Sequence, residues 1–215
     1  MTTIAPESLA LAARLRSATT MEHDEAENMA FVTKLMGGEL PIAALADFHA
    51  QHLTIYRALE DAGDALVNDP VAGNFVFEEL RRVPSLKADL EFLNGTEWES
   101  KIQVTQAAEE YAARIREAGT WAGGFIGHAY VRYLGDLSGG QAIGRLMQRT
   151  YGLEREGINF YHFEGIKPKP FKDSYRKLLD EADFTESQRD QVVEEAKLAF
   201  RLNTAMFAEL ATRHC

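Results

Sequence analysis

One histidine stands in a charged pattern that could bind a metal. Arg16, His23 and Glu27 follow one another at intervals of seven and four residues, so on a helix they share one stripe. Glu27 could accept a hydrogen bond from whichever imidazole nitrogen of His23 does not bind the metal. Arg16 lies about 10 Å from His23 at the helical rise per residue, a reach that suits a carboxylate at the edge of a porphyrin. A solvated charged face is the alternative, and spacing alone leaves both interpretations open.

A second pattern is a helical sequence weakened by glycines. Residues 130–141 read YVRYLGDLSGGQ, and apolar residues recur through this stretch at helical spacing. Each of Gly135, Gly139 and Gly140 costs a helix interior about 1 kcal/mol relative to alanine. Because Gly135 and Gly139 are four residues apart, they predict a bare strip of backbone that something flat and bulky could approach closely. A loop or a close helix crossing would explain the glycines equally well.

The other candidate residues carry weaker signals. His49 and His52 could touch one metal ion, but no matching Glu-x-x-His pair is present, and we expect a solvated stripe. Lys172 and Arg176 place two cations on one helix face, where they suit propionates or phosphates, or are ordinary surface charges. Asn203 lies between two phenylalanines on one face of the last predicted helix, and a buried Asn there would need hydrogen-bond partners.

The elements that must position these residues are predicted to be helices. Periodicity and end signals predict helices over residues 8–29, 30–36, 41–62, 84–93, 107–117, 121–151, 171–179 and 185–212. The last begins at a capping box, Thr185-Glu186-Ser187-Gln188. Residues 157–170 form the one sustained irregular region. With no βαβ alternation and no internal repeat, the sequence predicts a single all-α domain over residues 1–215, frayed over residues 1–7.

Composition narrows the function classes. The chain has 215 residues, 46% hydrophobic and 26% charged, which is typical of a globular protein with a substantial core. A formal charge of −10 argues against nucleic acid as the main partner. We find no apolar run long enough for membrane insertion, no signal peptide, and a polar C-terminus without a tail anchor. The sole cysteine, Cys215, is the last residue, so no internal disulfide is possible and we expect a cytoplasmic location.

The motifs together resemble the haem oxygenase family. YVRYLGDLSGGQ and the ATTMEHDEAEN context of His23 carry the likeness, which continues through TIYRALED, FYHFEGI, FKDSYR and EEAKLAFRLNTAMFAEL. These segments follow in the same order along nearly the whole chain, whose compact length is similar to that of the soluble bacterial members. The resemblance implies an all-α fold in which haem is sandwiched between a proximal helix and a glycine-kinked distal helix.

The resemblance also implies residue roles. His23 would be the axial ligand of the haem iron, with Glu27 as its hydrogen-bonded neighbour. Gly135 and Gly139 would lie over the distal face of the haem, where Asp136 would organise a water network supported by Tyr56, Arg132 and Asn203. The other haem contacts would come from Arg16, Tyr130, Gly140, Lys172, Arg176 and Phe207. Many family members carry lysine at the position of Arg16, which leaves the attacked meso carbon open.

The implied activity is the cleavage of haem b, both substrate and cofactor, to biliverdin, carbon monoxide and ferrous iron. Dioxygen would be the co-substrate, and electrons would come from a reductase or a ferredoxin-type donor, with iron release as the expected purpose. An acidic donor could dock on Arg81, Arg82, Lys87, Arg145 and Arg149. One alternative is a haem carrier or sensor on the same fold. A non-haem relative, such as a thiamin-degrading or di-iron enzyme, is another.

Overall fold

The described part of the chain, residues 9–215 with Gln141 in its backbone only, is helical and contains no strand in this computed structural model. The α-helices are α1 (Leu11–Ala18), α2 (Thr20–Glu27), α3 (Ala30–Gly37), α4 (Ile42–Ala65), α5 (Val83–Asn94), α6 (Trp98–Lys101), α7 (Gln106–Ala118), α8 (Ala122–Ala129), α9 (Gln141–Tyr151), α10 (Pro168–Glu181) and α11 (Glu186–His214). Short 3-10 turns are η1 (Ala72–Phe75), η2 (Glu78–Leu80) and η5 (Asn159–Tyr161), and two π-helical segments are η3 (Tyr130–Leu134) and η4 (Asp136–Gly140). The all-α prediction is confirmed, whereas the expected fraying of residues 1–7 concerns residues outside the described part.

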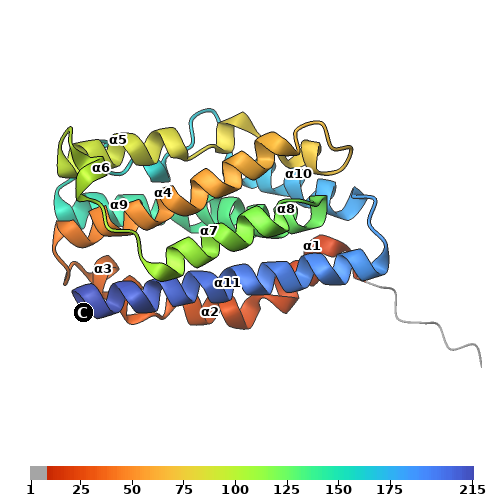
Figure 1. Ribbon diagram of the computed structural model, residues 1–215, viewed down its shortest axis with the longest axis horizontal. Helices are drawn as coiled ribbons and strands as arrows, with labels where there is room; N and C mark the ends of the chain where they lie inside the picture. Colours follow the sequence, from red (N-terminus) through yellow and green to blue (C-terminus); the bar gives the residue numbers. More distant parts are fainter. Residues whose placement is uncertain (1–8) are drawn as a thin grey trace, which may run out of the picture.

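Helix α4 forms the centre of the fold. It packs against α5, α7, α8 and α11, and Figure 1 shows it running between α5 and α7. Because neighbours cover so much of its surface, His49 and His52 are buried, at 0% and 2% exposure. The predicted solvated stripe at these two histidines is therefore wrong. Periodicity along one helix does not reveal how many sides its neighbours cover.

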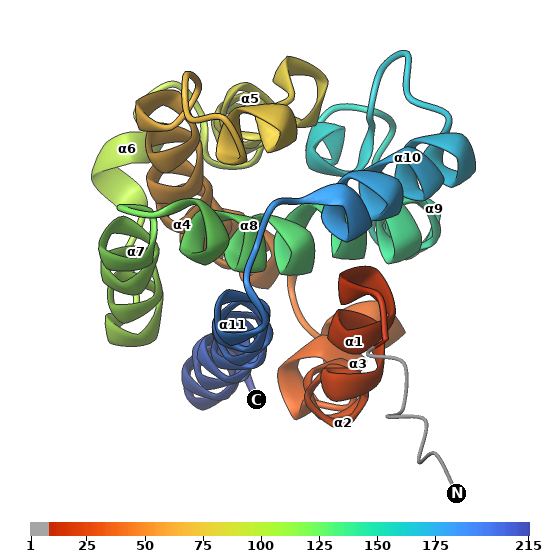
Figure 2. The ribbon, with the colours of Figure 1, turned by 90° about the vertical axis from the view of Figure 1, so that its right-hand side faces the viewer.

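The N-terminal helices form a separate group on one side of α11. Figure 2 shows α1, α2 and α3 together beside α11, which contacts all three. The predicted helix over residues 8–29 is divided at Thr19, which is buried and donates its hydroxyl to the Leu15 carbonyl at 2.8 Å. Thr20 bonds the Arg16 carbonyl in the same way, and such bonds to the preceding turn bend helices. Arg16 and His23 consequently lie on different helices.

The glycine-rich stretch stays helical but changes its winding. From α8 the backbone continues through η3 and η4 into α9, and Gly135 between the two π segments keeps right-handed helical dihedrals. The prediction of a helix over 121–151 with a glycine interruption is confirmed, and a loop is not formed. π-helical turns inside α-helices often mark functional sites, because they redirect the side chains that follow.

The irregular region is shorter than predicted, and a side chain on α5 binds its backbone. Helix α10 begins at Pro168, where the missing N–H of proline costs no helical hydrogen bond. Asp89 on α5 accepts hydrogen bonds from the backbone N–H groups of Asn159 and Phe160, each at 2.8 Å, and so fixes η5. The capping box at Thr185 is present with both reciprocal bonds. Among the described helices, none is both long and apolar enough to cross a bilayer.

Candidate functional site

Four polar side chains from four helical segments form one hydrogen-bonded network. Tyr56 on α4 donates its hydroxyl to a carboxylate oxygen of Asp136 on η4. Arg132 on η3 donates to the Tyr56 oxygen at 3.3 Å and to Oδ1 of Asn203 on α11 at 2.8 Å. The network therefore brings together residues that are up to 147 positions apart in the sequence, and it unites the predicted set of Asp136, Tyr56, Arg132 and Asn203.

Burial dominates the electrostatics of this network. Burial raises the pKa of Asp136 above its ordinary value, although Arg132, Tyr56 and Arg82 each act to lower it. Burial opposes the charged form of Arg132, but the surrounding Tyr56, Asp136 and Tyr111 raise its pKa overall. Burial also raises the pKa of Tyr56. The site therefore holds a fixed cation and a carboxyl that binds its proton more strongly than usual.

The glycines divide into two groups by what a side chain would meet. A Cβ built on Gly135 would meet no atom of the described structure within 4 Å, and one on Gly139 would meet only Ile143 at 3.8 Å. Gly140 is different: it is buried, and a Cβ there would lie 3.7 Å from the ring of Tyr161. Gly135 and Gly139 thus leave the backbone bare toward open space, as the bare-strip interpretation predicts. Gly140 differs in being buried beside Tyr161 rather than facing open space.

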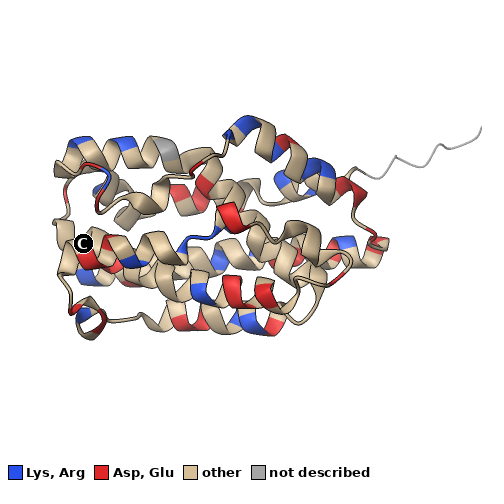
Figure 3. Cartoon of the chain, turned by 90° about the horizontal axis from the view of Figure 1, so that it is seen from above, with Lys and Arg blue, Asp and Glu red and all other residues tan. Residues whose placement is uncertain are grey.

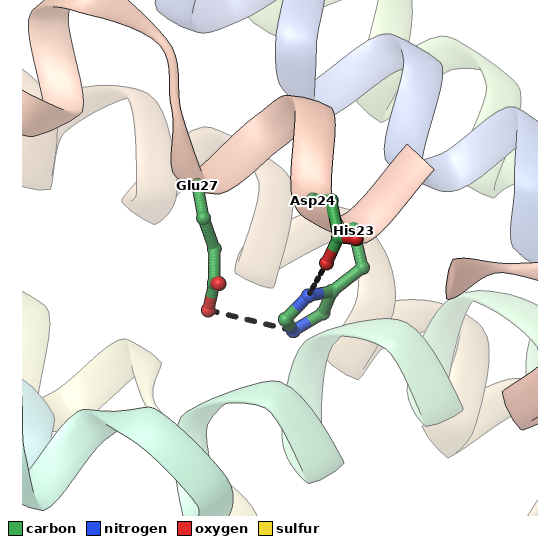
Figure 4. Close-up of side chains that lie close together, drawn as sticks. All are labelled: His23, Asp24 and Glu27. Atoms are coloured by element: carbon green, nitrogen blue, oxygen red, sulfur yellow. Dashed lines mark ion pairs between the residues drawn. The ribbon is translucent and has the colours of Figure 1, made fainter. Parts of the chain in front are cut away.

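His23 lies on α2 with a carboxylate on each side. Its Nε2 is 3.5 Å from Glu27 and its Nδ1 is 3.7 Å from Asp24. The His23 side chain is 48% exposed. Its ring is roughly perpendicular to the Phe200 ring, with 5.8 Å between the two ring centroids. In Figure 4 the imidazole points away from α2 toward a blue-green ribbon, and Glu27 reaches the same side. These three side chains could hold a metal ion, and the predicted pair of His23 and Glu27 is adjacent as the helical spacing requires.

Cations gather near Tyr130, at the start of η3. The positive charges of Arg176 and Arg16 act to lower the Tyr130 pKa, while burial raises it overall. Lys172 donates to Ser138 on η4 at 3.1 Å, and the nearby charge of Arg176 adds to burial in lowering the Lys172 pKa. Three elements therefore bring Arg16, Tyr130, Lys172 and Arg176 together, as a bound dianion would require.

Two further predictions have different outcomes. Phe207 is buried in the core, with its ring 5.9 Å from that of Phe48. The predicted docking patch fails at Arg82, which is buried, donates to the carbonyls of Leu80 and His162, and stacks 3.9 Å over the Phe163 ring. Arg145 and Arg149 on α9 are exposed, as the prediction requires. Figure 3 shows where Lys and Arg lie along the chain.

The sequence interpretation missed residues that support the site from outside the motif. Ser138 joins η4 to α10 through Lys172. Tyr161, in the irregular region, packs beneath η4 and α9, where a Cβ on Gly144 would lie only 3.0 Å from its own Cβ. Gly144 was a usable signal, because a glycine inside a predicted helix indicates a close neighbour.

Comparisons with known proteins agree on one family. The family model described as Heme oxygenase matches residues 9–209. A haem oxygenase of Rhodella violacea is 40% identical over 203 residues, covering 93% of this chain and 86% of the relative. Haem oxygenase 1 of Synechocystis is 33% identical over 205 residues, covering 94% and 85%.

Solved structures extend the similarity to three dimensions. The crystal structure of Synechocystis haem oxygenase-1 in complex with haem has a TM-score of 0.90 at 32% identity, and covers 95% of this chain and 94% of that chain. Haem oxygenase from Leptospira interrogans has a TM-score of 0.88 at 34% identity, with 94% and 100% covered. The chain belongs to the haem oxygenase family of haem-degrading enzymes.

Proposed function

We propose that this protein binds haem between α2 and the η3–η4 segment and cleaves it to biliverdin, carbon monoxide and ferrous iron. Dioxygen would be the co-substrate, and a separate reductase or ferredoxin-type donor would supply the electrons. The observation that carries the proposal is the intact network of Tyr56, Asp136, Arg132 and Asn203 beside the bare backbone of Gly135 and Gly139. Relatives that are solved with haem support the ligand.

His23 and Glu27 would form the proximal wall. An exposed imidazole can ligate haem iron without prior rearrangement of the core, since nothing buried has to open. Glu27 would accept a hydrogen bond from the imidazole nitrogen that does not bind iron, which requires the ring to turn so that its Nδ1 faces Glu27. That turn is available to a side chain that is half exposed and has only two carboxylate contacts, at 3.5 and 3.7 Å.

Gly135 and Gly139 would form the distal wall. Open space at their Cβ positions lets a flat ligand approach the main chain, and no distal side chain stands where the ligand would bind dioxygen. When bound, haem supplies the iron that activates dioxygen and the ring that is oxidised. At this wall the two glycines would present only backbone atoms to the ligand, because they have no side chains.

Asp136 would deliver protons through water. Burial raises its pKa, so the carboxyl takes up a proton more readily than an ordinary aspartate. Tyr56 donates to it and Arg132 holds Tyr56 in place, while Asn203 holds Arg132. Each member thereby restricts the next, and the carboxyl cannot swing toward the ligand.

The cations near Tyr130 would bind the haem propionates. Arg176 is paired with Asp173 at 3.1 Å in an exposed ion pair that a propionate could replace at little cost. Burial and the charge of Arg176 lower the pKa of Lys172, so they disfavour its charged form. A bound anion would stabilise that charged form. Arg16 would contact the same propionates from the side of α1. Phe207 would contribute to the wall of the haem pocket.

Reconstitution of the full chain with haem tests the proposal. Haem binds first without dioxygen, and reductant and dioxygen are then added. We expect loss of the Soret band, biliverdin absorption, and iron that a ferrous chelator captures. A persistent haem spectrum under these conditions would support a carrier or sensor, and failure to bind one haem per chain would favour a non-haem function.

A further inference from the structure

Arg16 differs from the other cations near Tyr130 in what holds it. Lys172 and Arg176 each contact a polar side chain, at 3.1 Å. The side chain of Arg16 is exposed, and it makes no hydrogen bond or ion pair with another described residue. Burial raises the pKa of Tyr130, and the charges of Arg176 and Arg16 act against this rise, so both guanidinium groups lie near the phenol. The position of Arg16 therefore depends on where the backbone of α1 lies.

The first turn of α1 is capped by a side chain from another helix. Ala10, at the N-cap position, has no side-chain oxygen that could accept from the free N–H groups of this turn. Asp180 on α10 takes that role, because its Oδ1 accepts from the N–H of Ala12 at 2.8 Å. A carboxylate also suits the positive end of the helix dipole. The start of α1 is thereby attached to α10.

The same hydrogen bond sets the register between α1 and α10. Ala12 and Arg16 are one turn apart on α1, so they share a helix face. Arg176 and Asp180 are likewise one turn apart on α10. Each arginine is thus one turn from the residue that its helix contributes to the bond, and both arginines reach Tyr130. The bond therefore fixes the register that brings the two guanidinium groups to one phenol.

A second attachment joins α1 to the start of α11. Arg14 donates to Glu186 at 2.8 Å and to Asp190. These two carboxylates are four residues apart at the beginning of α11, so they lie on one face and a single guanidinium bridges them. The Arg14 side chain is only 21% exposed, and a network of three charges holds better than an isolated surface pair. Helix α1 is thus attached at two points to two different helices.

We propose that the carboxylates of Asp180, Glu186 and Asp190 position Arg16 for the haem propionates, and thereby help to set the rotation of haem in its plane. The inference rests on the proposed function. Both propionates lie on one edge of the porphyrin, so the positions of the cations that bind them decide how the ring is turned about the axial bond. That rotation decides which meso carbon is oxidised. The three carboxylates are positioning residues, because they act through α1 and do not touch the ligand.

Hydrogen exchange of the full haem-free chain tests the attachment itself. In Asp180→Ala the N–H of Ala12 loses its acceptor, so the amides of α1 should exchange about 2- to 10-fold faster, the range set by the net free energy of one hydrogen bond. Asp180→Asn keeps a side-chain oxygen and should restore most of the protection. The matched control is Asp183→Ala, which removes an exposed carboxylate that has no ion pair with another described residue. Unchanged exchange in Asp180→Ala would overturn the proposal.

Titrations with haem and with haem dimethyl ester separate positioning of Arg16 from general support of the pocket. The ester lacks the carboxylates that Arg16 would bind. Asp180→Ala should weaken the binding of haem by about 2- to 10-fold, as the loss of one hydrogen bond allows, and leave the binding of the ester unchanged. Asp183→Ala should change neither affinity. An equal loss for both ligands would show that α1 only supports the pocket, and this result would overturn the proposal.

The rotation of haem is measured by proton NMR of the haem methyl groups in the ferric cyanide complex, and by the isomer composition of the biliverdin formed. The share of the parent's minor isomers should rise in Asp180→Ala and in Arg14→Met, and return toward the parent's value in Asp180→Asn. Unchanged ratios, with a parent protein that binds and cleaves haem, refute this inference and leave the proposed function intact. A parent protein that binds no haem refutes both, and hydrogen exchange then still decides whether the carboxylates hold α1.

Discussion

The two walls that we propose for the haem site, distal and proximal, are built in opposite ways. On the distal side, Tyr56, Arg132 and Asn203 are buried and fix one another and Asp136 by hydrogen bonds across α4, η3, η4 and α11. On the proximal side, His23 and Glu27 are exposed neighbours on one helix, and the His23 ring lies 3.5 Å from the Glu27 carboxylate without a hydrogen bond. The distal wall is preorganised by folding, whereas the proximal wall is completed by its ligand. We infer that substitutions in the two walls will have different effects. Changes in the distal wall should alter the free energy of unfolding and the rate of haem cleavage, and changes in the proximal wall should alter haem affinity.

The largest expected effect is on haem binding. His23→Ala would remove the proposed axial ligand, and haem affinity should fall by more than the roughly 10- to 100-fold cost of losing only a ligand's hydrogen-bonded neighbour. Titration followed by the Soret band measures it. Because His23 is exposed, Tm of the haem-free variant should equal that of the parent. A normal imidazole-ligated spectrum would show that another residue is the ligand.

Asp136→Ala should give the largest effect on chemistry. Loss of a positioned proton donor typically costs about 100-fold or more, so biliverdin formation should fall by that order with haem affinity unchanged. Asp61→Ala, which removes an exposed carboxylate from α4, is the control and should retain full activity. Undiminished turnover by Asp136→Ala would remove this residue from the proton path.

The contrast between the walls is sharpest in a matched pair of variants. Asn203→Leu leaves a buried Arg132 N–H without its acceptor, so it should lower the free energy of unfolding by about 1–3 kcal/mol. Glu27→Gln on the exposed wall should change it by less than about 0.5 kcal/mol, yet weaken haem binding by about 10-fold. Denaturant unfolding and haem titration of both proteins make the comparison. Equal stability losses would contradict the difference between the walls.

A smaller effect concerns the pH dependence of stability. The folded protein holds the Asp136 proton more tightly than the unfolded chain does, because burial raises this pKa above 3.8. As the pH rises above 3.8, this carboxyl ionises first in the unfolded chain. Ionisation stabilises the unfolded chain, so the free energy of unfolding falls. Asp136→Asn cannot ionise, so its Tm should exceed that of the parent at pH 7, and the difference should shrink as the pH approaches 4. A difference that is constant with pH would show that ionisation is not the cause.

The placement of residues within one continuous motif could be predicted from the sequence. The placement of residues whose neighbours come from distant segments of the chain could not. The spacing of Gly135 and Gly139 indicated a bare strip because both lie on one helix, and helical geometry alone decides their shared face. Likewise His23 and Glu27 are one turn apart whatever surrounds them. The prediction that a buried Asn203 would need partners was confirmed by its bond to Arg132, although the sequence could not name the partner without the family resemblance.

The failures have a common physical reason. His49 and His52 read as a solvated stripe, yet they are buried because several other helices pack around α4. Arg82 read as a surface cation, yet backbone carbonyls of the 160–162 region and the Phe163 ring surround it. In each case the deciding contacts come from segments far along the chain. Local pattern carries no information about them.

The winding of the distal segment has a consequence for how the chain can vary in length. Each residue removed from or added to a helix rotates everything after it by about 100°. The π segments at Tyr130–Leu134 and Asp136–Gly140 stand on either side of Gly135, so the direction of Asp136 is set by the number of residues counted through them. A single insertion within Tyr130–Leu134 would keep every motif residue and still turn the carboxyl of Asp136 away from Tyr56. This part of the chain should therefore accept substitutions more readily than insertions or deletions.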